Sequence, residues 1–373
     1  MAHAYTPGLK VTSRMSNRVI RMLPIKGDVM VQVGDTVTAN QIVAATYMPG
    51  DVYPLNMANM LAVPPKDVKE LMLLSEGSPV EEGEPLAQTA GIFGKFKKVF
   101  NSPYTGTVET ISDVTGQVIL RGPDIPVEVK GYMSGTVVEV TSEIGCVIEN
   151  EVAFVQGIFG IGGETCGTIK FAVNSSDSTL NASDITSEMK DCIVIGGARI
   201  TVESIEAARS VGVAAIIGGG MDDQDLKDFL GYDLGVAITG SEKKGITVIV
   251  TEGFGEISMA LRTFELLKKH EGHVASVNGA TQIRAGVMRP EIIIPLEEGT
   301  IKDEPDHAGG YLEIGKTLRI IRDPYFGIIG KVSALPPNPQ VLGSGSKARV
   351  LEVELNSGES VIVPRANVEL IEA

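Results

Sequence analysis

The sequence predicts a mixed β and α/β protein, with β structure at both ends of the 373-residue chain and an α/β domain between them. Two observations predict this fold class. Residues 1–165 and 316–373 contain short runs that alternate apolar and polar side chains between turn residues, which is typical of β-strands. Residues 166–300 contain short apolar runs, glycine loops and amphipathic helical stretches in succession, which is typical of an α/β domain.

The first region begins with short strands and tight turns. Residues 29–33 alternate valine with Met30 and Gln32, which predicts a half-buried strand. Gly34-Asp35 then predicts a turn, and Val37 begins the next strand. Glu82-Gly-Glu-Pro-Leu-Ala87 repeats the end of this unit later in the chain.

A second phrase also occurs twice. Residues 102–108 read Ser-Pro-Tyr-Thr-Gly-Thr-Val and are followed by Gly-Gln-Val-Ile at 116–119. Residues 134–137 read Ser-Gly-Thr-Val and are followed by Gly-Cys-Val-Ile at 145–148. The two phrases predict a degenerate internal repeat.

These phrases resemble the barrel-sandwich hybrid fold of biotinyl and lipoyl carrier domains, and the related barrels of electron-transport complex subunits. The resemblance implies a barrel-sandwich-hybrid-like β region over residues 1–165, with a helical insert at about 64–76. A carrier domain presents its modified lysine in a hairpin, often beside methionine. Lys95, Lys97 and Lys98 have other neighbours, so we expect no biotin, no lipoyl group and no other cofactor.

The central region predicts a βαβ unit. Residues 192–195 form a short apolar run, and Thr201 is a good cap for a helix that Gly212 ends. Residues 213–217 form the next apolar run, and its strand should lie parallel to the first.

Two further helices are expected in the same region. One follows Asp222 and ends at Gly231, and the other runs from about Ile257 to His270 after the strand at 245–250. This layout is similar to the swivelling α/β domains in mobile parts of multi-domain enzymes.

The last region, residues 316–373, returns to β structure. Its Pro324-Tyr-Phe-Gly-Ile-Ile-Gly-Lys-Val332 segment resembles the KOW motif of SH3-like barrels, which occur in ribosomal proteins and transcription elongation factors. The order of regions is similar to that of a family of bacterial KOW-containing proteins. The resemblance implies a C-terminal SH3-like KOW barrel.

Two groups of residues are candidate sites. Glycine loops that follow buried strands can bind an anion through free N–H groups, and they can equally be tight turns. The candidate anion-binding residues are Gly196, Gly197, Arg199, Gly218, Gly219, Gly220 and Arg284. The candidate interface residues are Asn278, Thr281, Gln282, Arg289, Tyr325 and Phe326.

Charge and composition narrow the function classes. The net charge of −15 opposes binding to nucleic acid, and Arg319–Ala373 contains six basic and six acidic residues, so it has no basic excess. The three cysteines and four histidines are too scattered for a metal site or a nucleophile–base pair, so we expect neither. No leader pattern or membrane-length apolar run is present, so we expect a cytoplasmic protein that does not enter a membrane.

The leading hypothesis is a non-enzymatic scaffold or assembly protein that contacts other proteins and self-associates into a homo-oligomer. One alternative is a KOW-dependent factor that docks on the ribosome or on RNA polymerase. A second alternative is an accessory subunit of a multi-domain enzyme. These hypotheses differ in the partner that the chain binds.

Overall fold

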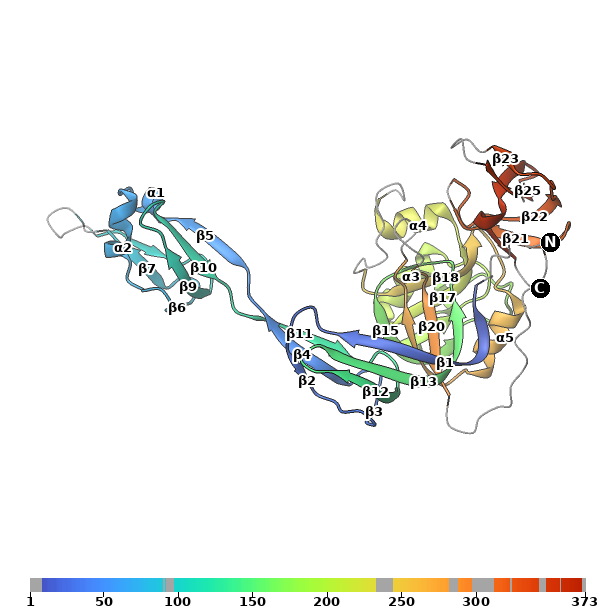
Figure 1. The fold of residues 1–373 in the computed structure, drawn as a ribbon, viewed down its shortest axis with the longest axis horizontal. Coiled ribbons are helices and arrows are strands. Elements are labelled where there is room, and N and C mark those ends of the chain that lie inside the picture. The colour runs from blue at the N-terminus through green and yellow to red at the C-terminus, as the bar shows by residue number, and fades with distance from the viewer. Residues whose placement is uncertain are drawn as a thin grey trace.

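A computed structural model describes residues 9–89, 91, 97–232, 244–281, 288–296, 312–322, 324–341, 347–355 and 357–370. Over these residues the fold is mixed and strand-rich, with several sheets and four separate hydrophobic cores. We name four modules after these cores: the middle, distal, α/β and C-terminal modules. Figure 1 shows that they form an elongated molecule, with the distal module at one end and the α/β and C-terminal modules at the other.

The middle module is built from strands that come from two separate stretches of the chain. Its elements are β1 (Val11–Met22), β2 (Asp28–Val29), β3 (Thr36–Val37), β4 (Ile42–Met48), β11 (Ile125–Lys130), β12 (Gly135–Thr141) and β13 (Gly145–Gln156). Its core includes Val31, Val37 and Val43. The strand that we predicted over 29–33 is shorter than expected, because the chain leaves β2 after Val29 and turns at Gly34.

The distal module is inserted between β4 and β11. Its elements are β5 (Val52–Asn56), α1 (Met57–Leu61), a 3₁₀ turn (Pro65–Asp67), α2 (Val68–Leu71), β6 (Pro79–Val80), β7 (Pro85–Gln88), β8 (Val99–Asn101), β9 (Gly106–Ile111) and β10 (Gln117–Arg121). Because β4 and β11 pair with each other in antiparallel register, everything between them leaves and re-enters the middle module at one place. Two chain segments, 49–51 and 122–124, form the neck that joins these modules.

The predicted internal repeat is confirmed by matching turns in the two modules. Gln32 N–H donates to Asp35 Oδ2 at 2.8 Å in the middle module. Glu81 N–H donates to Glu84 Oε2 at 2.9 Å in the distal module. The glycine between each pair has a positive φ, 96° at Gly34 and 87° at Gly83, which only glycine adopts without strain.

Matching bulges confirm the second half of the repeat. The β9–β10 and β12–β13 hairpins each contain a register shift just after the Gly-Thr-Val phrase. In β9 the partners are Val108 and Thr110, so Glu109 is the extra residue. In β12 they are Val137 and Glu139, so Val138 is the extra residue. The same phrase therefore bends the strand at the same place in both modules.

The α/β module has a parallel centre. Its elements are β14 (Phe159–Ile161), β15 (Glu164–Phe171), 3₁₀ turns at Ala182–Asp184 and Ser187–Met189, β16 (Cys192–Ile195), α3 (Val202–Val211), β17 (Ala215–Met221), α4 (Asp223–Leu230), β18 (Thr247–Phe254), α5 (Leu261–Lys269), β19 (Val274–Asn278) and β20 (Glu291–Pro295). The sheet order is β14-β18-β17-β16-β15-β19-β20-β13, and β15 to β18 are mutually parallel. The predicted βαβ unit is confirmed, and Gly212 ends α3 with a φ of 86°.

The third helix of this module begins later than predicted. We expected it from about Ile257, but α5 begins at Leu261 with Ala260 as its N-cap residue. The carboxylate of Glu252 accepts the Ala260 N–H at 3.0 Å, which fixes the start of the helix there. Residues 257–259 instead lie over the strand ends, where Met259 N–H bonds to Ser176 O at 3.1 Å.

One long strand joins the middle module to the α/β module. The first half of β13 pairs with β12, and its second half pairs with β20 of the α/β module. Strand β1 runs along the other edge of β13 over almost its whole length. The two modules therefore share one continuous sheet, which fixes how they are joined.

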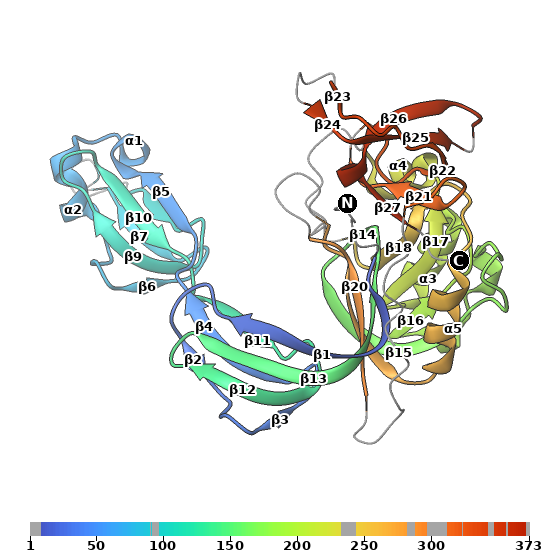
Figure 2. The ribbon, with the colours of Figure 1, turned by 45° about the vertical axis from the view of Figure 1, so that its right-hand side comes forward.

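The C-terminal module is an antiparallel sheet in the order β26-β25-β22-β21-β27, with its own apolar core. Its elements are β21 (Thr317–Ile320), β22 (Ile329–Ala334), β23 (Gln340–Val341), β24 (Lys347–Ala348), β25 (Val350–Leu355), β26 (Ser360–Pro364), a 3₁₀ turn (Arg365–Asn367) and β27 (Val368–Leu370). Figure 2 shows this module against the α/β module, on the side away from the neck.

Candidate functional site

The glycine loops lie at the carboxyl ends of β16 and β17, and the N–H groups of three of these glycines are bonded within the protein. Gly196 N–H donates to Ile217 O at 2.7 Å, and Gly219 N–H to Gly197 O at 2.9 Å. Gly220 N–H donates to Ala198 O at 2.6 Å. Anion binding would need free N–H groups. At Gly196, Gly219 and Gly220 the bonds favour the alternative of tight turns, because a bonded donor has nothing left to offer an anion.

Close backbone contacts explain why these positions are glycine. A Cβ on Gly219 would lie 2.3 Å from Ile257 O, and one on Gly220 would lie 2.2 Å from Gly255 O. A Cβ on Gly197 would lie 2.4 Å from Ser175 O. Gly218 lies within β17, where a Cβ would meet the side chain of Ile200. Neighbouring segments therefore pack directly onto the strand ends.

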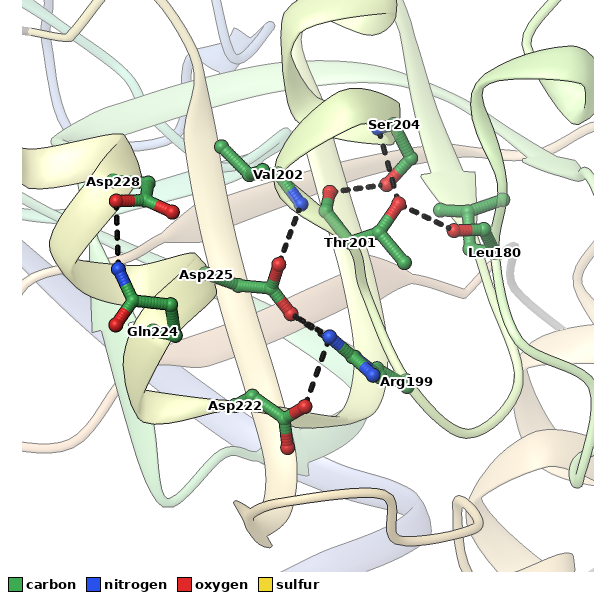
Figure 3. Close-up of polar contacts among 9 residues, drawn as sticks. All are labelled: Leu180, Arg199, Thr201, Val202, Ser204, Asp222, Gln224, Asp225 and Asp228. Atoms are coloured by element: carbon green, nitrogen blue, oxygen red, sulfur yellow. Dashed lines mark hydrogen bonds and ion pairs between the residues drawn. The ribbon is translucent and has the colours of Figure 1, made fainter.

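Arg199 lies beside these loops and faces carboxylates (Figure 3). Its Nε and Nη2 donate to Asp225 Oδ2 at 3.0 and 2.7 Å, and Nη2 lies 2.9 Å from Asp222 Oδ2. The hydrogen bond that Arg199 donates to Asp225 is the main reason that the pKa of Arg199 is raised, and Glu256 adds to the effect. One cation among three carboxylates makes a net negative surface, which does not favour an anionic ligand.

Asp225 links the starts of two helices. Its Oδ1 accepts the N–H of Val202, the first residue of α3, at 3.2 Å, although Asp225 itself belongs to α4. Thr201 Oγ1 accepts the Ser204 N–H at 3.2 Å, which confirms the predicted cap of α3. Figure 3 shows both caps on one side of the Arg199 guanidinium. This polar cluster therefore fastens α3 to α4.

The candidate interface residues near β19 make local contacts. Asn278 Oδ1 accepts the Ala280 N–H at 3.0 Å. Buried Thr281 donates to Gly160 O at 3.1 Å and accepts from Gly160 N–H at 2.8 Å, which ties this turn to β14. Gln282 and Arg284 lie outside the described residues.

Arg289 and Phe326 instead lie where the α/β and C-terminal modules meet. Arg289 Nη1 donates to Glu369 Oε2 of β27 at 2.9 Å. Phe326 packs against the α/β core, with its ring centroid 6.3 Å from that of Phe254. Tyr325 packs against the core of its own C-terminal module.

A buried cluster of four charges occupies the same contact. Arg319 Nη2 donates to Glu252 Oε2 at 3.0 Å, and Arg319 Nη1 lies 3.1 Å from Glu369 Oε1. The side chains of Arg319, Glu252 and Glu369 are only 3%, 6% and 1% exposed. Arg289 completes the cluster, so two cations balance two carboxylates. Burial lowers the pKa of Arg319, and the negative charges of Glu369 and Glu252 raise it by a smaller amount.

A second polar cluster lies where the middle and α/β modules meet. Tyr132 is buried, has a φ of 65°, and donates a hydrogen bond to Glu291 Oε1 at 3.1 Å. Arg21 forms a two-bond ion pair with Glu164, at 2.8 and 2.7 Å, and its guanidinium lies 5.5 Å from the Tyr132 ring. Burial raises the pKa values of Tyr132 and Glu291. Sequence reasoning missed this cluster, because its members are far apart along the chain.

Three further expectations concern carrier lysines, metal ligands and membrane-spanning helices. Lys97 and Lys98 directly precede β8, and Lys95 lies outside the described residues. That none of these lysines carries biotin or a lipoyl group therefore stays a prediction. Within the described ranges, no three His, Cys, Asp or Glu side chains gather as metal ligands would. Over the same ranges, no helix has the length and apolar composition to cross a membrane.

The chain was compared with known proteins on this basis. It matches no protein-family model and no curated protein.

Proposed function

We propose that the chain is a non-enzymatic scaffold that self-associates through its distal module. The observation that carries this proposal is that the distal module is a separate unit attached through a narrow neck. It has its own core, including Met57, Leu86 and Leu120, and among the described residues only the two neck segments join it to the remaining modules. Both ribbon views show it standing away from the α/β and C-terminal modules.

The neck is a defined structure. Gly122 N–H donates to Asp51 O at 2.8 Å, and Arg121 Nη1 donates to Gly50 O at 3.1 Å. Arg121 also pairs with Glu109 at 2.7 Å. These bonds hold the two neck segments together, so the distal module is presented at a fixed distance from the middle module.

Charge favours the distal module as the place where two copies meet. Residues 52–121 contain six basic and eight acidic residues, a net −2 out of −15 for the chain. Contact between the other modules would bring most of the negative charge of both copies together. Contact at the distal end keeps that charge apart.

The free end of the distal module also exposes apolar side chains. Val114, in the turn between β9 and β10, is 82% exposed, and Met60 of α1 is 41% exposed. The turn and the helix are neighbours, because Ala58 N–H donates to Gly116 O at 3.0 Å. Burying such side chains between two copies removes apolar surface from water and stabilises the contact.

The finer fold assignments are part of this proposal. The repeated turns and bulges support a barrel-sandwich hybrid for both the middle and distal modules. We assign the α/β module to the swivelling type and the C-terminal module to the SH3-like KOW type. Arg319 is buried against Glu252 and Glu369, so it is not available to nucleic acid while the C-terminal module is docked.

Light scattering after size exclusion tests the proposal with two matched variants. Val114→Asp places a charge at the free end of the distal module, and Ile362→Asp changes a 57% exposed apolar residue of the C-terminal module. We expect an oligomer for the wild type and for Ile362→Asp, and a monomer for Val114→Asp. A wild type that is monomeric at every concentration contradicts self-association. A monomer that co-sediments with ribosomes or RNA polymerase favours the docking-factor alternative.

A further inference from the structure

The C-terminal module touches the carboxyl end of β18 through backbone. A Cβ on Gly253 of β18 would lie 2.2 Å from Gly327 O of the C-terminal module. Beside this contact, Phe254 of β18 faces Phe326. In open α/β sheets the carboxyl ends of the strands are where ligands bind. The C-terminal module therefore covers a part of the sheet that comparable folds leave open.

The contact includes buried charges that are incompletely hydrogen-bonded. Arg319 Nη1 and Glu369 Oε1 attract each other at 3.1 Å without hydrogen-bond geometry. Arg319 Nε has no hydrogen-bond partner among the described residues. A buried ion pair contributes little net stability, because the cost of removing its charges from water offsets their attraction. Such a contact separates more easily than an apolar core of the same size.

Glu252 keeps a partner when the contact opens. Its Oε2 accepts from Arg319, and its Oε1 accepts the N–H of Ala260 at the start of α5. The helix start favours a negative charge, so the carboxylate stays stabilised after Arg319 leaves. The Glu252 carboxylate therefore has a hydrogen-bond donor both when the C-terminal module is docked and when it has separated.

We propose that the C-terminal module is a releasable cap over the carboxyl end of β18, with the Arg319–Glu252 pair as its latch. Release uncovers Gly253, Phe254 and the Glu252 carboxylate. A molecule that binds this edge binds only the released state, so it shifts the chain toward release by its difference in affinity. This device is separate from self-association through the distal module.

Hydroxyl-radical footprinting of the full chain tests the cap. Gly253→Ala inserts a methyl group into the contact and should release the module. Gly163→Ala is the matched control, because a Cβ there has nothing within 4 Å. We expect several-fold more oxidation at Phe254 and Phe326 in Gly253→Ala than in the wild type or the control. Oxidation at Phe229 and Phe264, two buried phenylalanines of the α/β core, should not change.

A second variant decides the result if Gly253→Ala does not fold. Glu252→Gln keeps an oxygen for the Ala260 N–H and removes the charge that holds Arg319. It should also increase oxidation at Phe254 and Phe326, with Phe229 unchanged. Unchanged oxidation at Phe254 and Phe326 in the folded variants would overturn the proposal. Increased oxidation that includes Phe229 would also overturn it, because the two modules would then unfold as one unit.

Discussion

The hydroxyl of Tyr132 donates a 3.1 Å hydrogen bond to Glu291, although the two residues are 159 positions apart in the chain. Tyr132 belongs to the core of the middle module, and Glu291 begins β20 of the α/β module. Ser276 Oγ also donates to the Tyr132 carbonyl. Together with the shared strand β13, these bonds fix the middle module to the α/β sheet.

Glu291 should make stability depend on pH. Burial raises its native pKa, so the folded protein binds this proton more tightly than the unfolded chain does. The resulting stabilisation is complete below the unfolded pKa and is lost as the pH rises through the native pKa. Glu291→Gln keeps an acceptor for Tyr132 and removes the titration. Urea unfolding from pH 4 to pH 8 should show a smaller fall in stability for the variant, and equal falls would contradict the assignment.

Arg319 should be far more important to stability than an exposed arginine. Arg319→Met leaves Glu252 buried without its cation and Glu369 with Arg289 alone, which should cost about 3–5 kcal/mol. Arg18→Met removes an arginine that is 67% exposed in its pair with Glu149, and should cost about 0–1 kcal/mol. Chemical denaturation of both variants checks the difference, and similar losses would show that the buried cluster has no special role.

Much of the fold was predictable from local sequence. Thr201 and Gly212 mark the two ends of α3 because a hydroxyl cap and a positive φ are local properties. The repeated Gly-Thr-Val phrase likewise reproduces its bulge in both modules. The insertion of the distal module was not predictable, because it depends on pairing between β4 and β11 across the whole inserted segment.

The roles of the candidate site residues were less predictable from the sequence than the fold. A glycine in a sequence can provide a free N–H, a positive φ or room for a neighbouring backbone, and the letters alone do not separate these uses. At Gly219 and Gly220 the structure shows the third use. The Arg319 cluster depends on Glu252, which is 67 positions earlier, so only the packing of the two modules reveals it.

Gly219 should not tolerate a side chain. Its Cβ would lie 2.3 Å from Ile257 O, and backbone there is held by neighbouring hydrogen bonds. Gly219→Ala should therefore destabilise the α/β module by about 1–3 kcal/mol. Thermal unfolding beside Gly163→Ala, which has open space, provides the comparison. Equal melting temperatures would show that the segment over the strand ends moves freely.

Asp225 should stabilise the link between α3 and α4. Asp225→Ala removes one of the two aspartate partners of Arg199 and the acceptor for Val202 N–H, so we expect a loss of about 1–3 kcal/mol. Asp228→Ala changes an exposed residue of the same helix and should cost less than about 0.5 kcal/mol. Urea midpoints measure both, and a neutral Asp225→Ala would contradict the linking role.

The molar mass of a chain without its distal module is the direct test of self-association through that module. Met48 and Ile125 are paired across β4 and β11, so residues 49–124 can be replaced by a short Asn-Gly turn that closes a hairpin. We predict that light scattering gives an oligomer for the full chain and a folded monomer for the shortened chain. Oligomers of the same order for both chains, or monomers for both, would contradict self-association through the distal module.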